Sequence, residues 1–292
     1  MTRRVILFLL ATGVALMATT EVLADFRHTR MGARPRALGS AFVSLSDDPN
    51  ATLWNPAGLT RDNRLALMAS RAWMYSVSEL SHDYLTVDVP AWHGLHFGAS
   101  FVRLGIHDVY YEDVYHLAVA AEAPFLEGLS VGATGKIFRL TAPGYEQLND
   151  PSYDGGDTGF AADIGFHYDS GEAWTLGGVV YNLNEPYLQL LSTTIDPDPV
   201  YSQFALGGSY LFRDTLTLIC DLRSREGGWD NSAVHLGAEI WFFDAMALRS
   251  GLNAGMVTMG VGLQDVRWQA DIALETHNEL GNVYLLSFTV RN

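Results

Sequence analysis

The few residue patterns that could carry out chemistry each fail at a required position. Residues 132–136 resemble a phosphate-binding loop, but that pattern needs a glycine at position 130 and a serine or threonine after the lysine. The chain has Ser130 and Ile137 there. Neither a Gly-x-Ser-x-Gly nucleophile elbow nor a His-Glu-x-x-His zinc motif occurs. We therefore expect no catalytic residues, no metal site and no cofactor.

Charged residues offer two smaller possibilities. Asp47 and Asp48 form an adjacent carboxylate pair that could bind a cation. Such a pair more commonly caps a helix or forms a turn, here for a short helix around residues 50–54. Glu239 and Arg249 fall on segments that we expect to be neighbouring strands. If both face the interior of a barrel they should pair, because charge is tolerated there and costly on a lipid-facing surface.

The composition limits the class of protein before any fold is considered. The 292 residues are 48% hydrophobic and only 17% charged, which excludes a disordered chain. Cys220 is the single cysteine, so a disulfide framework is excluded as well. The formal net charge of -15 disfavours contact with a phosphate backbone, and we expect no nucleic-acid partner.

The N-terminus has the features of an export signal. Arg3 and Arg4 precede an apolar stretch over residues 5–17, and residues 22–24 offer a cleavage site after Ala24. The apolar stretch is short for a membrane-spanning helix, which takes roughly 20 residues. We therefore expect residues 1–24 to be a cleaved signal peptide and the mature protein to leave the cytoplasm.

Beyond residue 63, apolar and polar residues alternate with a period of two. Phe160, Ile164 and Phe166 fall on one face of their segment, and Asp163 and His167 on the other. This pattern indicates a half-buried strand, or a membrane-barrel strand with apolar side chains toward lipid and polar ones toward the lumen. We expect about fourteen such strands. They lie near residues 64–76, 79–90, 93–105, 112–123, 128–140, 156–168, 173–183, 200–212, 214–224, 231–243, 245–253, 256–263, 265–277 and 281–291.

The connections between these strands sort by length. Counted from the first strand, every even-numbered connection is tight, whereas the odd-numbered set includes two long ones at residues 141–155 and 184–199. Outer-membrane barrels have short turns at the periplasmic end and longer external loops. Aromatic residues beside tight turns, such as Tyr168, Trp174 and residues 241–243, suit an interfacial girdle. The sequence thus predicts an all-β transmembrane antiparallel barrel.

Residues 25–63 precede the first strand and do not alternate. This segment contains a Gly-Ala-Arg start, an Asp-Asp pair and a Trp-Asn-Pro-Ala-Gly-Leu element in that order, and a Gly-x-Glu-aromatic and Ala-Leu-Arg-x-Gly run follows late in the chain. The residues that define these motifs are Gly32, Asp47, Asp48, Trp54, Asn55, Pro56, Ala57 and Gly58, followed by Glu239, Arg249 and Gly251.

Together the two runs resemble the PorV/PorQ family, whose relatives include the FadL channels for hydrophobic compounds. The resemblance is anchored at both ends of the chain and weak over residues 64–230. It implies a barrel of about fourteen strands over residues 64–292. It also implies that residues 25–63 fold into or under the lumen as a plug.

Two functions follow from this resemblance. The PorV branch implies a non-enzymatic accessory to protein secretion of the type IX kind, with exported proteins and secretion-system components as partners. The alternative is a FadL-like channel for hydrophobic small molecules with a lateral opening. Tyr187, Leu188, Leu190 and Leu191 would then form an apolar landing site. Both functions place the protein in the bacterial outer membrane, in contact with lipid. An outer-membrane phospholipase is a third possibility, although no serine–histidine pair is singled out.

Overall fold

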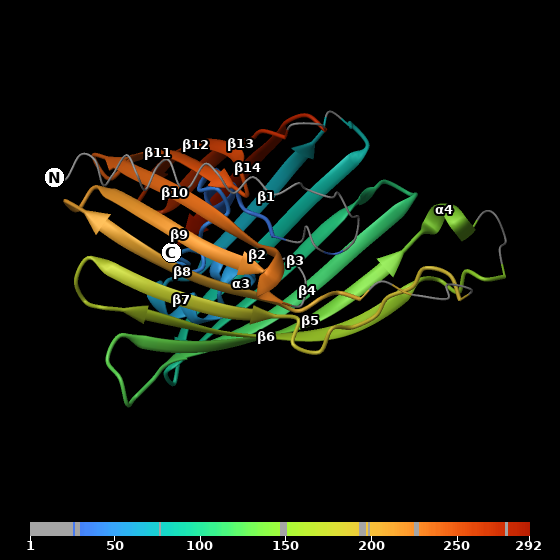
Figure 1. Ribbon diagram of the computed structural model, residues 1–292, viewed down its shortest axis with the longest axis horizontal. Coiled ribbons are helices and arrows are strands. Elements are labelled where there is room, and N and C mark those ends of the chain that lie inside the picture. The colour runs from blue at the N-terminus through green and yellow to red at the C-terminus, as the bar shows by residue number, and fades with distance from the viewer. Residues whose placement is uncertain are drawn as a thin grey trace.

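The barrel is closed and antiparallel. The computed structural model describes residues 26, 30–75, 77–146, 151–192, 197, 199–224, 228–277 and 280–292. The expected signal peptide, residues 1–24, lies outside the described residues. Fourteen strands pair in sequence order, and β14 pairs with β1 to close the sheet (Figure 1). No helix among the described residues is long and apolar enough to cross a membrane.

The strands fall where the alternation predicts them, with ends that differ by a few residues. The predicted fold class is therefore confirmed. The strands are β1 (Ala66–Met74), β2 (Leu80–Trp92), β3 (Leu95–Ile106), β4 (Tyr110–Glu122), β5 (Leu129–Thr141), β6 (Asp157–Asp169), β7 (Trp174–Tyr181), β8 (Gln203–Phe212), β9 (Leu216–Ser224), β10 (Ser232–Phe242), β11 (Met246–Asn253), β12 (Met256–Asp265), β13 (Trp268–Glu275) and β14 (Val283–Arg291).

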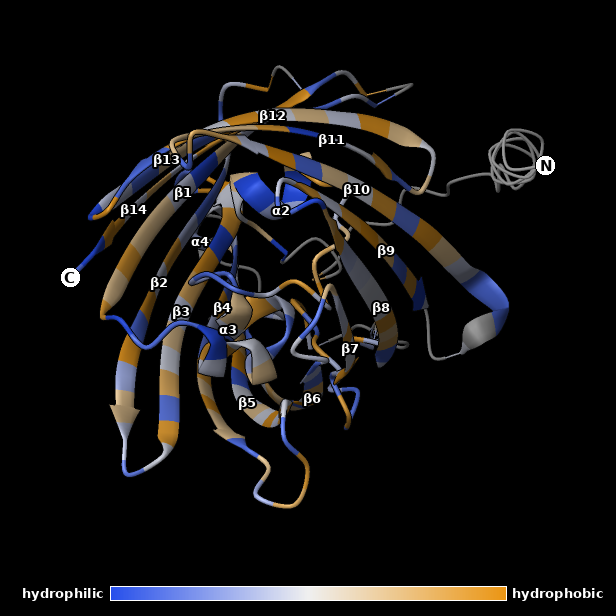
Figure 2. Cartoon of the chain, turned by 90° about the vertical axis from the view of Figure 1, so that its left-hand side faces the viewer, coloured by the Kyte–Doolittle hydropathy of each residue, from blue (hydrophilic) through white to orange (hydrophobic). Residues whose placement is uncertain are grey.

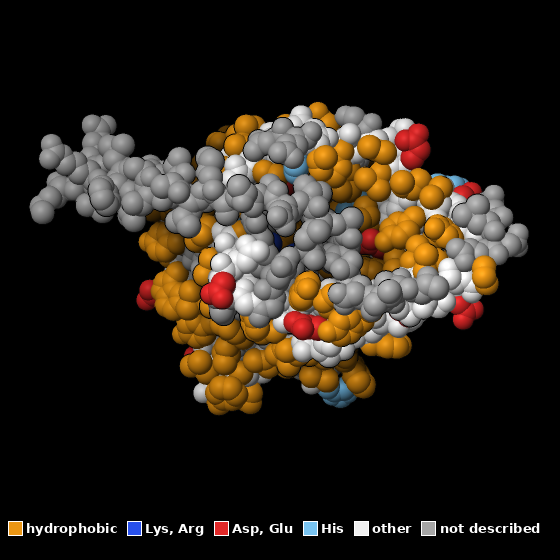
Figure 3. Space-filling model, turned by 45° about the vertical axis from the view of Figure 1, so that its right-hand side comes forward, with side chains coloured by type: hydrophobic (Ala, Val, Ile, Leu, Met, Phe, Trp, Pro, Cys, Tyr) orange, Lys and Arg blue, Asp and Glu red, His pale blue; other side chains and the backbone are white. Residues whose placement is uncertain are grey.

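Most side chains that face outward along these strands are apolar, and most polar side chains face the lumen. In β6, Phe160 is 62% and Ile164 55% exposed, whereas Asp163 and His167 are buried. Figure 3 shows hydrophobic side chains over much of the outer surface. The outer wall is mainly apolar, as a membrane barrel presents to lipid, and it also carries ion pairs such as that of Arg71 with Asp83.

The connections are sorted between the two ends of the barrel as the sequence predicts. The β5–β6 and β7–β8 connections are the long ones, and they share what we call the long-loop end, where α4 (Pro143–Glu146) also lies (Figure 1). At the opposite end, the rings of Tyr168 and Trp174 lie 5.6 Å apart beside a short turn. Trp241 does not belong to the expected aromatic girdle. It occupies an inward-facing position of β10, and the Arg249 guanidinium lies 5.5 Å from its ring centroid.

Residues 30–63, called the plug below, occupy the lumen. Buried Leu38 and Trp54 of the plug belong to one apolar cluster with Met68 of β1 and Leu285 of β14. The core of the molecule therefore lies between the plug and the barrel wall. Figure 2 shows the two plug helices inside the ring of strands. The plug elements are α2 (Ala33–Ala37), α3 (Ala51–Trp54) and the 3-10 helix η2 (Pro56–Arg61).

Candidate functional site

Arg34 of α2 is the centre of the contacts that hold the plug. Its guanidinium lies 2.5 Å from the carboxylate of Asp47, 3.0 Å from that of Asp48 and 2.9 Å from that of Glu239 on β10. Burial opposes the charge of Arg34, but the carboxylates of Asp47 and Glu239 outweigh burial and hold its pKa above the usual value. A buried charge network thus joins the plug to the wall.

The wall side of this network consists of Glu239, Arg249 and Asp271. The Arg249 guanidinium on β11 lies 2.5 Å from the Glu239 carboxylate and 2.7 Å from that of Asp271 on β13. Glu239 and Arg249 therefore pair in the lumen, as expected from the sequence. Asp48 also accepts a hydrogen bond of 2.9 Å from the backbone N–H of Asn50, directly before α3. Both aspartates thus pair with Arg34, and Asp48 forms a turn before α3; neither caps this helix, whose N-cap residue is Asn50.

Trp54 and Asn55 connect separate parts of the plug to each other and to the wall. The Trp54 indole N–H donates to the carbonyl of Met31 at 2.8 Å. The Asn55 amide donates to the carbonyls of Val43 and Phe166, both at 2.9 Å. Since Phe166 belongs to β6, Asn55 attaches the plug to a different strand from the one that Arg34 contacts.

Glycines allow the plug to approach its neighbours closely. Gly32 has a φ of 103°, and a Cβ there would lie 2.0 Å from the Asn50 side chain. A Cβ on Gly251 of β11 would lie 2.3 Å from the backbone nitrogen of Gly39. The remaining motif residues are buried within the plug: Pro56, Ala57 and Gly58. The structure thus places the residues of the sequence motif at contacts that hold the plug together and attach it to the wall.

The inner wall becomes apolar toward the long-loop end. Buried side chains of β4, β5 and β6 create this surface: Val114, Phe138, Leu140 and Ala161. Leu188 and Val200 of the β7–β8 connection pack over them, in one cluster with Phe26. We call these side chains the apolar compartment. They offer a hydrophobic surface inside the lumen.

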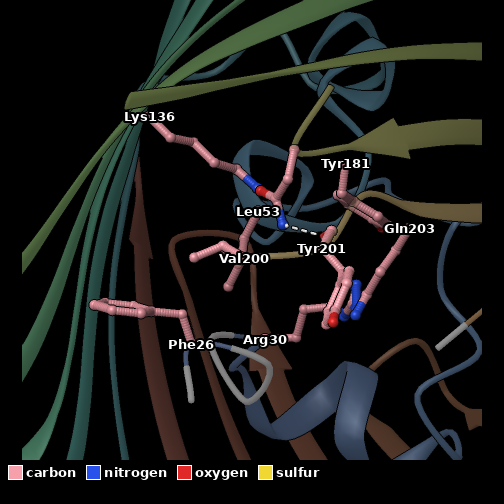
Figure 4. Close-up of a pocket in the computed structure, with 9 residues that line it drawn as sticks. Phe26, Arg30, Leu53, Lys136, Tyr181, Val200, Tyr201 and Gln203 are labelled. Atoms are coloured by element: carbon pink, nitrogen blue, oxygen red, sulfur yellow. Dashed lines mark hydrogen bonds between the residues drawn. The ribbon is translucent and has the colours of Figure 1, made fainter. Parts of the chain in front are cut away.

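A small polar pocket adjoins the apolar compartment (Figure 4). Its cavity of about 20 Å³ has room for about one water molecule. Lys136 of β5 reaches into it, with its ammonium 2.7 Å from the Asp163 carboxylate and 3.0 Å from the Asn182 side-chain oxygen. Arg30 lines the same pocket, and burial together with the nearby Arg223 lowers the pKa of Arg30 to about 9. The site therefore combines an apolar surface with a polar end.

A loop rather than a strand closes the wall beside the apolar compartment. Ile164 and Val180 are the last pair between β6 and β7 toward the long-loop end, so residues 157–163 have no partner on that side among the described strands. Polar groups of the β7–β8 connection cover this edge instead. The contacts are Leu183 N–H to Ala162 carbonyl at 2.9 Å, Asn184 amide to Phe160 carbonyl at 2.6 Å, and Gln189 N–H to Asp157 carboxylate at 3.0 Å.

Sequence analysis did not identify the apolar compartment. The one available signal is the adjacent Ile137 and Phe138, which make both faces of β5 apolar at that point. The expected landing site on the external loop is divided in the structure. Leu188 is buried and Leu190 packs against the compartment, whereas Tyr187 is 63% exposed.

Comparison with known proteins establishes the fold. No protein-family model matches the chain, and no curated protein sequence does. The solved CymD monoaromatic hydrocarbon channel is similar over 92% of this chain and 99% of its own, with a TM-score of 0.64 and 14% identity. The toluene transporter TbuX of Ralstonia pickettii is similar over 91% of this chain and 100% of its own, with a TM-score of 0.58 and 15% identity. A FadL homologue of Pseudomonas aeruginosa is similar over 86% and 95%, with a TM-score of 0.58 and 13% identity.

These likenesses give the chain the barrel fold of FadL-type channels. They do not confirm the resemblance to the PorV/PorQ family. At such low sequence identity they establish the fold alone, so the function has to be argued from the interior of this barrel.

Proposed function

We propose that the chain is a non-enzymatic outer-membrane channel through which small hydrophobic molecules cross. The apolar compartment carries this proposal, because Val114, Phe138 and Leu140 face the lumen of a barrel type whose interior is ordinarily polar. Small-molecule sites are mostly apolar with a few placed polar groups. Lys136 and Arg30 at one end of the compartment supply such groups.

The route in this proposal leaves the barrel sideways. The plug occupies the lumen, and the ion pairs of Arg34 fix it to the wall. The β7–β8 connection lies over residues 157–163 of β6 and is attached to them by a few hydrogen bonds. A strand would instead form a continuous ladder of backbone hydrogen bonds. A cavity of about 20 Å³ does not admit an aromatic molecule, so the loop has to move before a ligand enters.

The proposal places the protein in the outer membrane. The apolar outer wall suits a bilayer, and the export signal expected at residues 1–24 would deliver the chain to the outer membrane. The similar structures are named as a monoaromatic hydrocarbon channel and a toluene transporter, which supports hydrophobic small molecules as the partners.

The secretion-accessory role ranks behind the channel. It would need a surface that binds exported proteins, whereas the feature that sets this barrel apart lies in its interior. Purification from native outer membranes in mild detergent separates the two roles. Stoichiometric exported proteins or secretion components without a bound hydrophobic compound would favour the secretion role.

Uptake of radiolabelled toluene by cells that produce the protein tests the channel. Leu188→Ser places a hydroxyl in the apolar compartment and should lower uptake several-fold. Tyr187→Ser changes the adjacent exposed residue and should leave uptake unchanged. Both variants should keep the heat-dependent mobility shift of a folded barrel on a detergent gel. Equal uptake by the wild type and by cells without the protein would overturn the proposal.

A further inference from the structure

We infer that the outer wall across β8 to β12 holds the acyl chain of a membrane lipid in a defined groove. The groove is an open depression of about 620 Å³, a volume within the range of small-molecule sites. This inference rests on the membrane location proposed above and is independent of transport.

The shape of the groove comes from side-chain size. Small residues on four successive strands form its floor: Gly208, Cys220, Ala238 and Ser250. Gly208 pairs directly with Cys220, and Ala238 pairs directly with Ser250. Larger outward side chains stand beside them, including Tyr210, Leu218, Leu236 and Leu252. The wall is therefore recessed along a line that crosses the strands.

The chemistry of the groove favours a hydrocarbon chain. None of the side chains that line it carries a charge. It lies midway along the strands, and exposed apolar residues such as Leu206, Leu222 and Leu248 continue the surface around it. Lipid tails are as apolar as leucine, so the preference must come from packing, and a recess offers a flexible chain more contacts than a convex wall.

A second copy of this chain fits the groove poorly. Closed dimers are commonly two-fold, and a two-fold interface presents the same patch from both partners. Two recesses of the same shape would face each other and leave a void between them. A separate flexible chain fills the recess without this problem.

Photocrosslinking in vesicles tests the inference. The purified protein is reconstituted into phosphatidylcholine vesicles that contain a phosphatidylcholine with a diazirine in its acyl chain, and crosslinked residues are mapped by mass spectrometry. Residues of the groove should crosslink several-fold more than the exposed Leu117 of β4 and Phe160 of β6. The double substitution Ala238→Leu with Ser250→Leu fills the recess and should remove this enrichment.

A matched control enlarges outward residues elsewhere on the wall. Ala133→Leu with Ala162→Leu changes β5 and β6, where both side chains are exposed, and should keep the enrichment at the groove. Uniform crosslinking around the wild-type barrel would overturn the inference. A dimer captured by a bismaleimide through Cys220 would overturn it in favour of a second copy. Failure of the protein to insert into vesicles would instead contradict the membrane location.

Discussion

Arg34 of the plug and Glu239 of β10 form a bidentate ion pair, with two N–O contacts of 2.9 Å each, inside the barrel. A bidentate guanidinium–carboxylate pair fixes orientation as well as distance. The plug is therefore held in one position relative to the late strands, and its removal would take away one of the two guanidinium partners of Glu239. This ion pair makes the plug an integral part of the fold.

Loss of the Arg34 guanidinium should destabilise the barrel strongly. Arg34→Met leaves the carboxylates of Asp47 and Asp48 without their main partner, and breaking a buried pair in this way costs about 3–5 kcal/mol. Denaturant unfolding in detergent, followed by tryptophan fluorescence, measures the loss. The exposed pair of Arg64 with Asp62 provides the control, since Arg64→Met should cost about 0–1 kcal/mol. Equal losses in the two variants would contradict the central place of Arg34.

The close contact between Gly251 and the plug should also contribute to the stability of the barrel. A methyl group there meets the backbone nitrogen of Gly39, so Gly251→Ala should cost about 1–3 kcal/mol through overpacking. Gly135→Ala on the outer face of β5 meets nothing within 4 Å and should not destabilise the barrel. Thermal unfolding of the two variants checks this. A neutral Gly251→Ala would mean that the plug is loosely seated.

Asp221 should anchor the middle of the plug. Its carboxylate accepts hydrogen bonds from the backbone N–H of Phe42 at 2.7 Å and of Val43 at 2.9 Å. Asp221→Ala leaves these buried donors unsatisfied, at a cost of about 1–3 kcal/mol. Hydrogen exchange at the two amides should become faster relative to the strands. Unchanged protection there would show that Asp221 is dispensable.

The loop that closes the wall should loosen in acid. Hydrogen bonds from the Ser202 hydroxyl and backbone N–H hold the pKa of Glu185 below its usual value. A lowered carboxyl pKa stabilises the fold above the unfolded value, and this contribution is lost as the pH falls through the folded value. Protection factors for residues 182–192 should therefore decrease below about pH 4. Glu185→Gln should make this change smaller, and an identical profile in both proteins would exclude Glu185 as the cause.

The fold was predictable because every strand has one face toward the lumen or plug and one toward the outside, which imposes a period of two on the sequence. Trp241 was expected in the aromatic girdle, but its indole lies near Arg249 inside the lumen. The pair of Glu239 and Arg249 was predictable from strand order alone. Arg34 was not, because its partners are brought together only when the plug enters the barrel.

The apolar compartment escaped sequence analysis for a related reason. An inward Phe138 beside an outward Ile137 looks like ordinary strand composition. Leu188 comes from a connection that does not alternate, and Val200, which was expected to begin a strand, lies in that connection before β8. A site made by a loop folded over a strand edge has no short-range signature.

The selectivity of uptake tests the central claim most directly. Toluene and a sugar are supplied to cells with and without the protein, and the initial uptake rates are compared. The proposal predicts that the protein raises the rate for toluene and leaves that for the sugar unchanged. A rise for the sugar alone, or for neither solute, would contradict a channel for hydrophobic molecules.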